Sequence, residues 1–432
     1  MLQAQSFIGL FVFIGLAFLF SQDRKAVSFQ FILWGIGFQL LLALLVLGIP
    51  SLGFNGPLKI VFEVANDGIL RILQFTQEGS SFILGDLVKS DKIGFILAFQ
   101  VLPIIIFLSS LMTVLYHLGI MQAIVNVFAI LMQKVLKISG AESLAAAANV
   151  FVGQTEAPLI IRPYLKNMTS SELFSVMVGG MATIAGSVMA AYVGFLKDFI
   201  PGIGGHLLTA SILSAPAALV IAKIIVPEKS VPETMGRVPK DGVSHFVNAI
   251  EAAASGATEG MKLAVNVAAM LLAFVALIAM MDALLITIGE WIFFDQWGTT
   301  VTPEIFLKEG APELSLSFIL SWLFTPIAFF LGIPWQDLNI AGALIGKKIV
   351  FNEFIAYLEM AKVGSTLHPR SAIILSYALC GFANFSSIAI QIGGIGSLIP
   401  ERKSELARFG MRAVIGGSLA AFITASIAGL LI

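Results

Sequence analysis

The chain has 432 residues, of which 58% are hydrophobic and only 12% are charged. Soluble domains carry about 25% charged residues, so this chain has too little polar surface to coat a soluble globule. Its formal net charge of −1 produces no overall positive potential that would attract nucleic acid. Its single cysteine, Cys380, excludes an intramolecular disulfide and a cysteine-based metal site. The composition therefore indicates a protein that crosses a lipid bilayer several times.

Eight apolar runs are long enough to cross a bilayer, which takes about 20 helical residues. The runs are 5–21, 28–49, 93–118, 173–196, 206–226, 258–290, 371–398 and 409–431. An even number of crossings puts both termini on the same side of the membrane. Lysines and arginines concentrate on one face, which the positive-inside rule makes cytoplasmic. Both termini are therefore predicted to lie outside.

The charges that decide this orientation lie between the apolar runs. The basic ones are Arg24, Lys25, Lys223, Lys229, Arg237, Lys240, Arg402, Lys403, Arg408 and Arg412. The segment 291–313 instead carries a single lysine, Lys308, beside four acids: Asp295, Glu304, Glu309 and Glu313. Because basic loops favour the cytoplasmic side, this acidic segment is expected outside.

Four further apolar segments are too short or too polar to be crossings. Residues 120–137 and 314–333 are predicted to be interfacial helices. Residues 141–165 and 338–361 are predicted to be re-entrant hairpins, because each has a helix of small residues, a polar break and a second short apolar helix.

The same order of elements therefore occurs twice, in residues 120–226 and 314–432. Each copy has an interfacial helix, a hairpin, an interrupted span and a further span. One copy starts inside and the other outside, which is the inverted-topology repeat of many secondary transporters. The predicted fold is an all-α polytopic membrane protein with eight transmembrane helices and two re-entrant helical hairpins. Residues 1–92 are predicted to form peripheral N-terminal spans and an external loop.

The first predicted hairpin is interrupted by three consecutive polar residues, Gln154, Thr155 and Glu156. A helix cannot run smoothly into Pro158, which lacks an amide hydrogen and disfavours helix in the preceding residue. Polar backbone at membrane depth is tolerated only beside water or buried in protein. An amide, a hydroxyl and a carboxylate together can recognise a heterocyclic amide such as a nucleobase. The alternative is a helix cap with one snorkelling carboxylate, although an acid inside a membrane is a functional candidate by default.

The second predicted hairpin is interrupted at Asn352 and Glu353. A carboxylate is a good acceptor for vicinal hydroxyls, so a sugar is a natural ligand for Glu353. The alternative is that Glu353 forms an ion pair with Lys347 or Lys348, which precede it by a few residues.

Glycine clusters interrupt the spans that follow the two hairpins, at residues 179–188 and 380–396. Glycine permits unwinding of a helix, and unwound carbonyl oxygens can bind sodium. Close helix–helix packing is the alternative explanation for these glycines.

At these breaks the sequence resembles the concentrative nucleoside transporter family. The stretches that carry the resemblance are Val101–Phe107, Tyr116–Gly119, Gly153–Leu159, Gly332–Asp337, Asn352–Phe354 and Tyr377–Asn384. They extend over nearly the whole chain from about residue 93. The eight-span layout is similar to that of bacterial members, which implies a multi-pass protein of the bacterial inner (plasma) membrane.

The resemblance implies an inward-facing homotrimer with a scaffold that includes residues 93–119 and 258–290, and a transport domain made from both repeats. It also implies which residues bind a nucleoside. The residues at the base are Gln154, Thr155, Glu156 and Val188, with Phe382 near the base. Those at the ribose are Glu353, Asn384 and Ser387.

The family's sodium site maps to the side chains of Asn149 and Thr183 and to the carbonyl groups of Val152 and Ile184. Thr183 stands where some members have serine, and its hydroxyl preserves the ligand. Neutral oxygens of this kind favour sodium. The resemblance thus predicts a sodium–nucleoside symporter, not an enzyme. It would import uridine-like pyrimidine nucleosides by alternating access and would bind membrane lipid but no nucleic acid.

Three other functions remain open at this point. The first is a proton-coupled nucleoside symporter, since some family members couple to protons. The second is a channel or sensor with the same fold. The third and most remote is an intramembrane lipid-pyrophosphate phosphatase, which needs a nucleophile or an arginine among acids, and only Arg162 lies near a hairpin tip.

Overall fold

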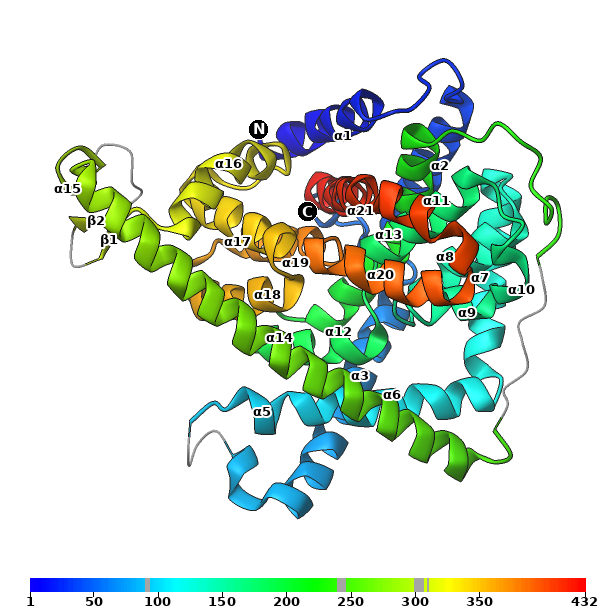
Figure 1. Cartoon of the computed structure of the whole chain (residues 1–432), viewed down its shortest axis with the longest axis horizontal. Coiled ribbons are helices and arrows are strands. Elements are labelled where there is room, and N and C mark those ends of the chain that lie inside the picture. The colour runs from blue at the N-terminus through cyan, green and yellow to red at the C-terminus, as the bar shows by residue number, and fades with distance from the viewer. Residues whose placement is uncertain (90–93, 239–245, 299–306, 309–310) are drawn as a thin grey trace.

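The computed structural model describes residues 1–89, 94–238, 246–298, 307–308 and 311–432. Within these residues the chain is almost entirely helical (Figure 1). The exception is a short antiparallel pair, β1 (Leu307–Lys308) with β2 (Ala311–Pro312). The prediction of an all-α polytopic membrane protein is confirmed, because seven described helical stretches are long and apolar enough to cross a membrane.

The seventh predicted span, 371–398, is divided into two helices in the structure. They are α19 (Pro369–Ala378) and α20 (Phe385–Leu398), and neither is long enough to cross a bilayer alone. The number of crossings and the two re-entrant hairpins therefore stay predictions.

The N-terminal region contains more helix than hydropathy indicates. After α1 (Leu2–Leu19) and α2 (Phe29–Leu47) comes α3 (Lys59–Leu84), in the part predicted as an external loop. This part is therefore helical, and its position outside the membrane stays a prediction. Polar residues recur among the apolar ones in α3, so no apolar run is visible. One of them, Asn66, accepts a hydrogen bond from the Gly204 backbone amide at 3.0 Å, which ties α3 to the core.

Two helices form a peripheral pair, α6 (Leu102–His117), which follows α5 (Leu97–Gln100), and α14 (Ala249–Trp291). Asn248 starts α14 earlier than predicted, because its side chain accepts hydrogen bonds from the first turn, as an N-cap does. With 43 residues, α14 is about 65 Å long, roughly twice the thickness of the hydrocarbon layer. It crosses the whole molecule diagonally in Figure 1.

The remaining helices occur in two series of similar order. The first series is α7 (Ile120–Leu136), α8 (Gly140–Asn149), α9 (Ala157–Ile160), α10 (Arg162–Leu165), α11 (Ser170–Ala182), α12 (Gly186–Leu196) and α13 (Ile203–Ile225). The second is α16 (Leu316–Phe330), α17 (Leu338–Val350), α18 (Glu353–Val363), α19, α20 and α21 (Lys403–Leu431). Between the series lie α14 and the short α15 (Phe294–Trp297). Short 3-10 turns complete the described helices: η1 (Pro50–Leu52), η2 (Gly85–Val88), η5 (Trp335–Asp337), η6 (Gly364–Thr366) and η7 (Pro400–Arg402).

The core is built from the two series, where α11, α13 and α21 pack on one another. In the most apolar 18-residue window, 94% of the residues are buried for Ser170–Leu196 but only 6% for α14. The core helices are therefore covered by other helices, whereas α14 presents its apolar surface outward.

The two ends of the chain lie close together (Figure 1), and the Gln3 side chain donates a hydrogen bond to the Ile432 carbonyl at 3.3 Å. This proximity agrees with both termini on one side of the membrane. The predicted sidedness rests partly on Lys240, Glu304 and Glu309, which lie outside the described residues.

Candidate functional site

The first hairpin breaks where the sequence places glycine and proline. Helix α8 ends at Asn149, and α9 starts with Pro158 in its first turn, where a missing amide hydrogen costs nothing. Between them the carbonyl of Gly153 accepts hydrogen bonds from the amides of Glu156 and Ala157, at 3.2 and 3.1 Å. A Cβ on Gly153 would lie 2.4 Å from Glu156 Oε2. The Glu156 carboxylate therefore folds back over this turn, and a side chain at residue 153 would displace it.

The second hairpin breaks at an N-cap. Asn352 Oδ1 accepts a hydrogen bond from the Ile355 amide at 2.9 Å, so α18 starts immediately with Glu353. The predicted alternative, an ion pair between Glu353 and Lys347, is wrong because Lys347 pairs with Glu359 at 2.5 Å.

Lys348 does not take up that ion pair in the described residues either. Its side chain is fully buried, and its ammonium has no hydrogen-bond partner within the described part of the chain. It still interacts electrostatically with the Glu353 carboxylate. This buried cation offsets part of the charge of the acid.

The two broken spans meet at their interruptions. The Phe382 amide donates to the Thr183 carbonyl at 3.2 Å, joining the gap between α19 and α20 to the gap between α11 and α12. Gly381 sits in this contact with φ +141°, and a Cβ there would lie 2.9 Å from the carbonyl oxygens of Met181 and Ala182. The crossing therefore requires glycine at residue 381.

The tips of both hairpins and the starts of α12 and α20 enclose one cavity. It is lined by all eight residues predicted to bind a nucleoside: Gln154, Thr155, Glu156, Val188, Glu353, Phe382, Asn384 and Ser387. Apolar side chains of α14 form the outer wall: Leu263, Val267, Met270 and Leu271. Residues from both series and from the peripheral helix thus surround a single space with a polar and an apolar side.

Glu353 is held by two hydrogen-bond donors on different elements. The Tyr192 hydroxyl on α12 donates to Oε1 at 2.8 Å, and the Asn384 amide donates to Oε2 at 3.0 Å. Asn384 also caps α20, with Oδ1 accepting from the Ser387 amide at 2.9 Å. Tyr192 was not predicted, because no local pattern distinguishes it from the other aromatic residues of a buried helix.

Gln154 is held in a second chain of hydrogen bonds. Its amino group donates to the Ser387 hydroxyl at 3.0 Å, and its oxygen accepts from the Gln391 amino group at 3.1 Å. Gln391 also donates to the Met177 carbonyl at 2.9 Å. Gln391 is not among the predicted site residues, although a glutamine within an apolar span is a signal visible in the sequence.

The residues predicted to bind sodium lie behind the first hairpin tip. Asn149 is buried, and neither polar atom of its side chain has a hydrogen-bond partner within the described residues. The Thr183 hydroxyl donates to the Gly179 carbonyl at 2.9 Å, which leaves its lone pairs available. The carbonyl oxygens of Val152 and Ile184 accept no hydrogen bond from a described residue.

Leaving a buried amide unpaired lowers the free energy of unfolding by about 1–3 kcal/mol. A ligand bound to the Asn149 side chain would remove this cost. Neutral carbonyl, amide and hydroxyl oxygens suit a hard cation. The donor set is therefore compatible with sodium as cargo.

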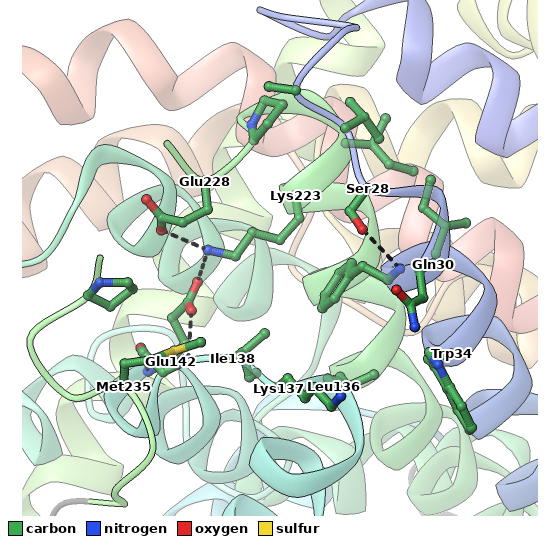
Figure 2. Close-up of a pocket in the computed structure, with 18 of the residues that line it drawn as sticks. Ser28, Gln30, Trp34, Leu136, Lys137, Ile138, Glu142, Lys223, Glu228 and Met235 are labelled. Atoms are coloured by element: carbon green, nitrogen blue, oxygen red, sulfur yellow. Dashed lines mark hydrogen bonds and ion pairs between the residues drawn. The ribbon is translucent and has the colours of Figure 1, made fainter. Parts of the chain in front are cut away.

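A second cavity lies between the start of α2, the α7–α8 turn and the segment after α13 (Figure 2). Lys223 bridges two acids there, Glu142 at 2.6 Å and Glu228 at 3.2 Å. Burial alone would raise the pKa of the Glu228 carboxyl, but Lys223 and nearby hydrogen-bond donors outweigh it and hold that pKa below its ordinary value. These charges satisfy one another, and none of the predicted site residues lines this cavity.

Three family models match successive parts of the chain. Residues 8–87 match the model "Na+ dependent nucleoside transporter N-terminus", and residues 98–199 match "Nucleoside recognition". Residues 206–429 match "Na+ dependent nucleoside transporter C-terminus".

Full-length relatives agree with these models. An uncharacterized transporter of Haemophilus influenzae is 44% identical, with 99% of this chain and 97% of that protein covered. Sodium/nucleoside cotransporter 1 of Mus musculus is 39% identical over 99% of this chain, and the chain spans 64% of the length of that mammalian relative.

Solved structures of CNTnw are similar over the whole chain. The inward-facing substrate-bound state has a TM-score of 0.87 at 41% identity, with 100% of this chain and 98% of that one covered. A variant in an outward-facing state has a TM-score of 0.88 at 40% identity, with the same coverage.

The helix breaks around one cavity, the apolar spans and the similarity to CNTnw together define a multi-pass membrane protein of the nucleoside transporter class. More particularly, the chain belongs to the sodium-dependent nucleoside transporter family, whose members are transporters rather than enzymes and take sodium as the co-transported ion. The resemblance found in the sequence is confirmed.

Proposed function

We propose that this chain is a sodium–nucleoside symporter that imports uridine-like pyrimidine nucleosides by alternating access. The observation that carries the proposal is the cavity at which both hairpin tips meet, with acids from each tip in its lining. Gln154, Thr155 and Glu156 would contact the base, with Val188 and Phe382 against its faces. Glu353, Asn384 and Ser387 would contact the ribose.

The position of the candidate sodium ligands supports coupling. Asn149 ends the helix that leads directly into the tip carrying Gln154 and Glu156. An ion bound by Asn149, Val152, Thr183 and Ile184 would order that tip and raise the affinity for nucleoside, and by reciprocity the nucleoside would raise the affinity for sodium. One charge moving through 100 mV is worth about 2.3 kcal/mol, which corresponds to a roughly fifty-fold accumulation.

The exposed helix pair supports a stationary scaffold. The apolar surface of α14 and its contact with α6 suit a homotrimer interface, and the two helical series, 120–226 and 314–432, would form the moving transport domain. CNTnw has been determined in inward- and outward-facing states, which agrees with alternating access. We place the trimer in the inner membrane of a bacterium, in contact with lipid and with both termini outside.

Uptake into proteoliposomes tests the proposal. Labelled uridine should accumulate under an inward sodium gradient, and replacing sodium with choline at fixed pH should abolish accumulation. Accumulation driven by a proton gradient in choline would contradict sodium coupling. Counterflow of labelled uridine separates a carrier from a channel, and a competition panel of nucleosides decides the base preference.

Replacing Asn149 by alanine tests the ion site separately. In the wild-type protein, sodium should raise Tm relative to choline, because the ion binds only the folded state. In Asn149→Ala the fold should survive, since the lost amide has no protein partner within the described residues, but the sodium-dependent rise in Tm should disappear. Asn167→Ala, at an exposed hydrogen bond to Glu233, is the control and should keep the rise. An unchanged sodium-dependent rise in the Tm of Asn149→Ala would show that the ion binds at another site.

A further inference from the structure

We propose that Gln391 fixes the orientation of the Gln154 side-chain amide, so that Gln154 acts as a hydrogen-bond donor to a carbonyl oxygen of the nucleobase. This inference rests on the proposed function, because it concerns the same cavity. Gln391 does not line the cavity itself, so it is a positioning residue that acts through Gln154.

One group near Gln391 can take only one hydrogen-bonding role. The carbonyl of Met177 on α11 can only accept a hydrogen bond. Gln391 on α20 lies 2.9 Å from it, so the atom of Gln391 that faces this carbonyl must be the amino group. The reversed amide would set two oxygens against each other without a proton between them. The backbone of α11 thereby determines the orientation of the Gln391 amide.

The same amino group then determines the orientation of Gln154. It lies 3.1 Å from Gln154 Oε1, so Gln154 must turn its oxygen toward Gln391. Its own amino group consequently points to Ser387, whose hydroxyl accepts at 3.0 Å and which lines the cavity. A hydroxyl can rotate and exchange partners, so this amino group is available to a ligand.

Packing holds the two glutamines in place. Gln391 is fully buried and Gln154 is 7% exposed. A Cβ at Gly180 on α11 would lie 2.8 Å from the Gln154 Cβ and 3.0 Å from the Gln391 amino group. Glycine at residue 180 therefore makes the space in which the two side chains lie against α11, and the hydrogen bonds to Met177 and between the two glutamines set the orientation of both amides.

The consequence is chemical selectivity. A donor at Gln154 recognises an acceptor on the base, such as a carbonyl oxygen of uracil, and it disfavours an amino group at the same position. Without Gln391, the Gln154 amide loses one hydrogen bond and could turn either its oxygen or its amino group toward the base. The selectivity for a carbonyl would then be lost while the cavity kept its shape.

The experiment compares uridine with 2-thiouridine and 4-thiouridine, since sulfur is a weaker acceptor than oxygen. In the wild-type protein, one of the two thio analogues should have a KM about ten-fold above that of uridine, as expected for loss of one hydrogen bond. Gln391→Met conserves volume and removes the amide. This variant should raise the KM for uridine about ten-fold and remove the penalty for the thio analogue.

Two further variants separate positioning from a general structural effect. Gln39→Met is the matched control, because Gln39 is also a buried glutamine whose amino group donates to a backbone carbonyl, that of Leu213 at 2.9 Å, but away from the cavity. This control variant should leave the thio penalty, the ratio of the KM for the thio analogue to the KM for uridine, unchanged. In a Gln154→Leu background, Gln391→Met should have no additional effect on KM, because residues that act through one another are not additive.

A thio penalty that persists in Gln391→Met, or additive effects of Gln391→Met and Gln154→Leu, would overturn the inference while the proposed function stands. Failure of the wild-type protein to take up any nucleoside would overturn both. Loss of the thio penalty in Gln391→Met but not in Gln39→Met is the result that supports it.

Discussion

The two acids of the cavity are held differently, and the difference suits two tasks. Glu353 receives hydrogen bonds from Tyr192 and Asn384, one on each carboxylate oxygen. Its geometry is therefore set before a ligand arrives, which would suit the proposed recognition of ribose hydroxyls at low entropic cost. Glu156 folds back over Gly153 on the turn itself, so a modest change of the turn can redirect its carboxylate.

Removing the Tyr192 hydroxyl tests this preorganisation. Tyr192→Phe should raise the KM for uridine about ten-fold or more, because a hydrogen bond to a charged group contributes about 1.5–3 kcal/mol. The ring stays, so the packing against Tyr357, at 4.4 Å between centroids, should be kept. Steady-state uptake measures the effect.

Tyr357→Phe is the control for that prediction. Its hydroxyl donates to the Ser376 carbonyl at 2.7 Å rather than to Glu353. The variant should lower Tm and leave the KM for uridine unchanged. Equal KM values for Tyr192→Phe and the wild-type protein would show that Glu353 does not need this donor.

At the scale of elements, the site depends on helices that begin inside the core. Four helices start at the cavity, α9, α12, α18 and α20, and each leaves unpaired backbone amides at its first turn. Asn352 and Asn384 satisfy some of these amides by capping α18 and α20. Helix N-termini also carry partial positive charge, which stabilises nearby carboxylates. The breaks therefore supply both space and electrostatic support for Glu156 and Glu353.

The crossing of the broken spans is sensitive to a single methyl group. Gly381→Ala should lower Tm and abolish most uptake, because its Cβ would lie 2.9 Å from the Met181 and Ala182 carbonyl oxygens and φ is +141°. Gly393→Ala on α20 meets no atom within 4 Å. It should keep uptake and stabilise slightly, by about 0.5–1 kcal/mol, as alanine does in a helix.

Thermal unfolding and uridine uptake of the two variants check this prediction. Gly381→Ala with normal uptake would mean that the spans can separate at their crossing without loss of the site.

At the scale of the whole molecule, ion pairs tie the segment after α13 to the first series of helices. Lys223 contacts Glu142 at the start of α8 and Glu228 in the segment (Figure 2). It also donates a hydrogen bond to the Ser171 hydroxyl on α11. Lys229 in the same segment contacts Asp23, between α1 and α2. These pairs hold the segment after α13 and the connection between α1 and α2 to the first series of helices.

Stability should therefore depend on pH through Glu228. Its pKa is lower in the folded protein than in the unfolded chain, so its contribution is present above the unfolded pKa, about 4.3, and is lost as pH falls through the folded value. Tm of the wild-type protein should decrease over this acidic range, and Glu228→Gln should decrease less.

Glu401→Gln provides the comparison, because Glu401 forms only an exposed pair with Lys166 at 3.8 Å and such pairs contribute little. Its Tm should follow the wild-type curve. Identical acid profiles for Glu228→Gln and the wild-type protein would assign the acid sensitivity to other groups.

Local chemistry in the sequence was enough to locate the breaks. Pro158 and Gly153 interrupt the first hairpin, and Gly381 lies in the gap of the second broken span, because backbone constraints act within a few residues. The gap of the first broken span, residues 183–185, contains no glycine, and Gly179 and Gly180 lie inside α11. Periodicity and hydropathy also located most of the apolar helices, but they missed α3, whose polar residues interrupt any apolar run and one of which, Asn66, forms a hydrogen bond with the core. The residues around the cavity were named from a family resemblance rather than from these patterns.

By itself, the sequence determined that this is a helical membrane protein, and it located the two helix breaks that carry Glu156 and Glu353. Only the tertiary structure decided which side chains meet. Tyr192 reaches Glu353 across 161 residues, and Gln391 reaches Gln154 across 237, while Lys347 pairs with Glu359 instead of Glu353. Hydrogen bonds of this kind depend on how the two helical series pack against each other, and no local pattern of residues records that packing.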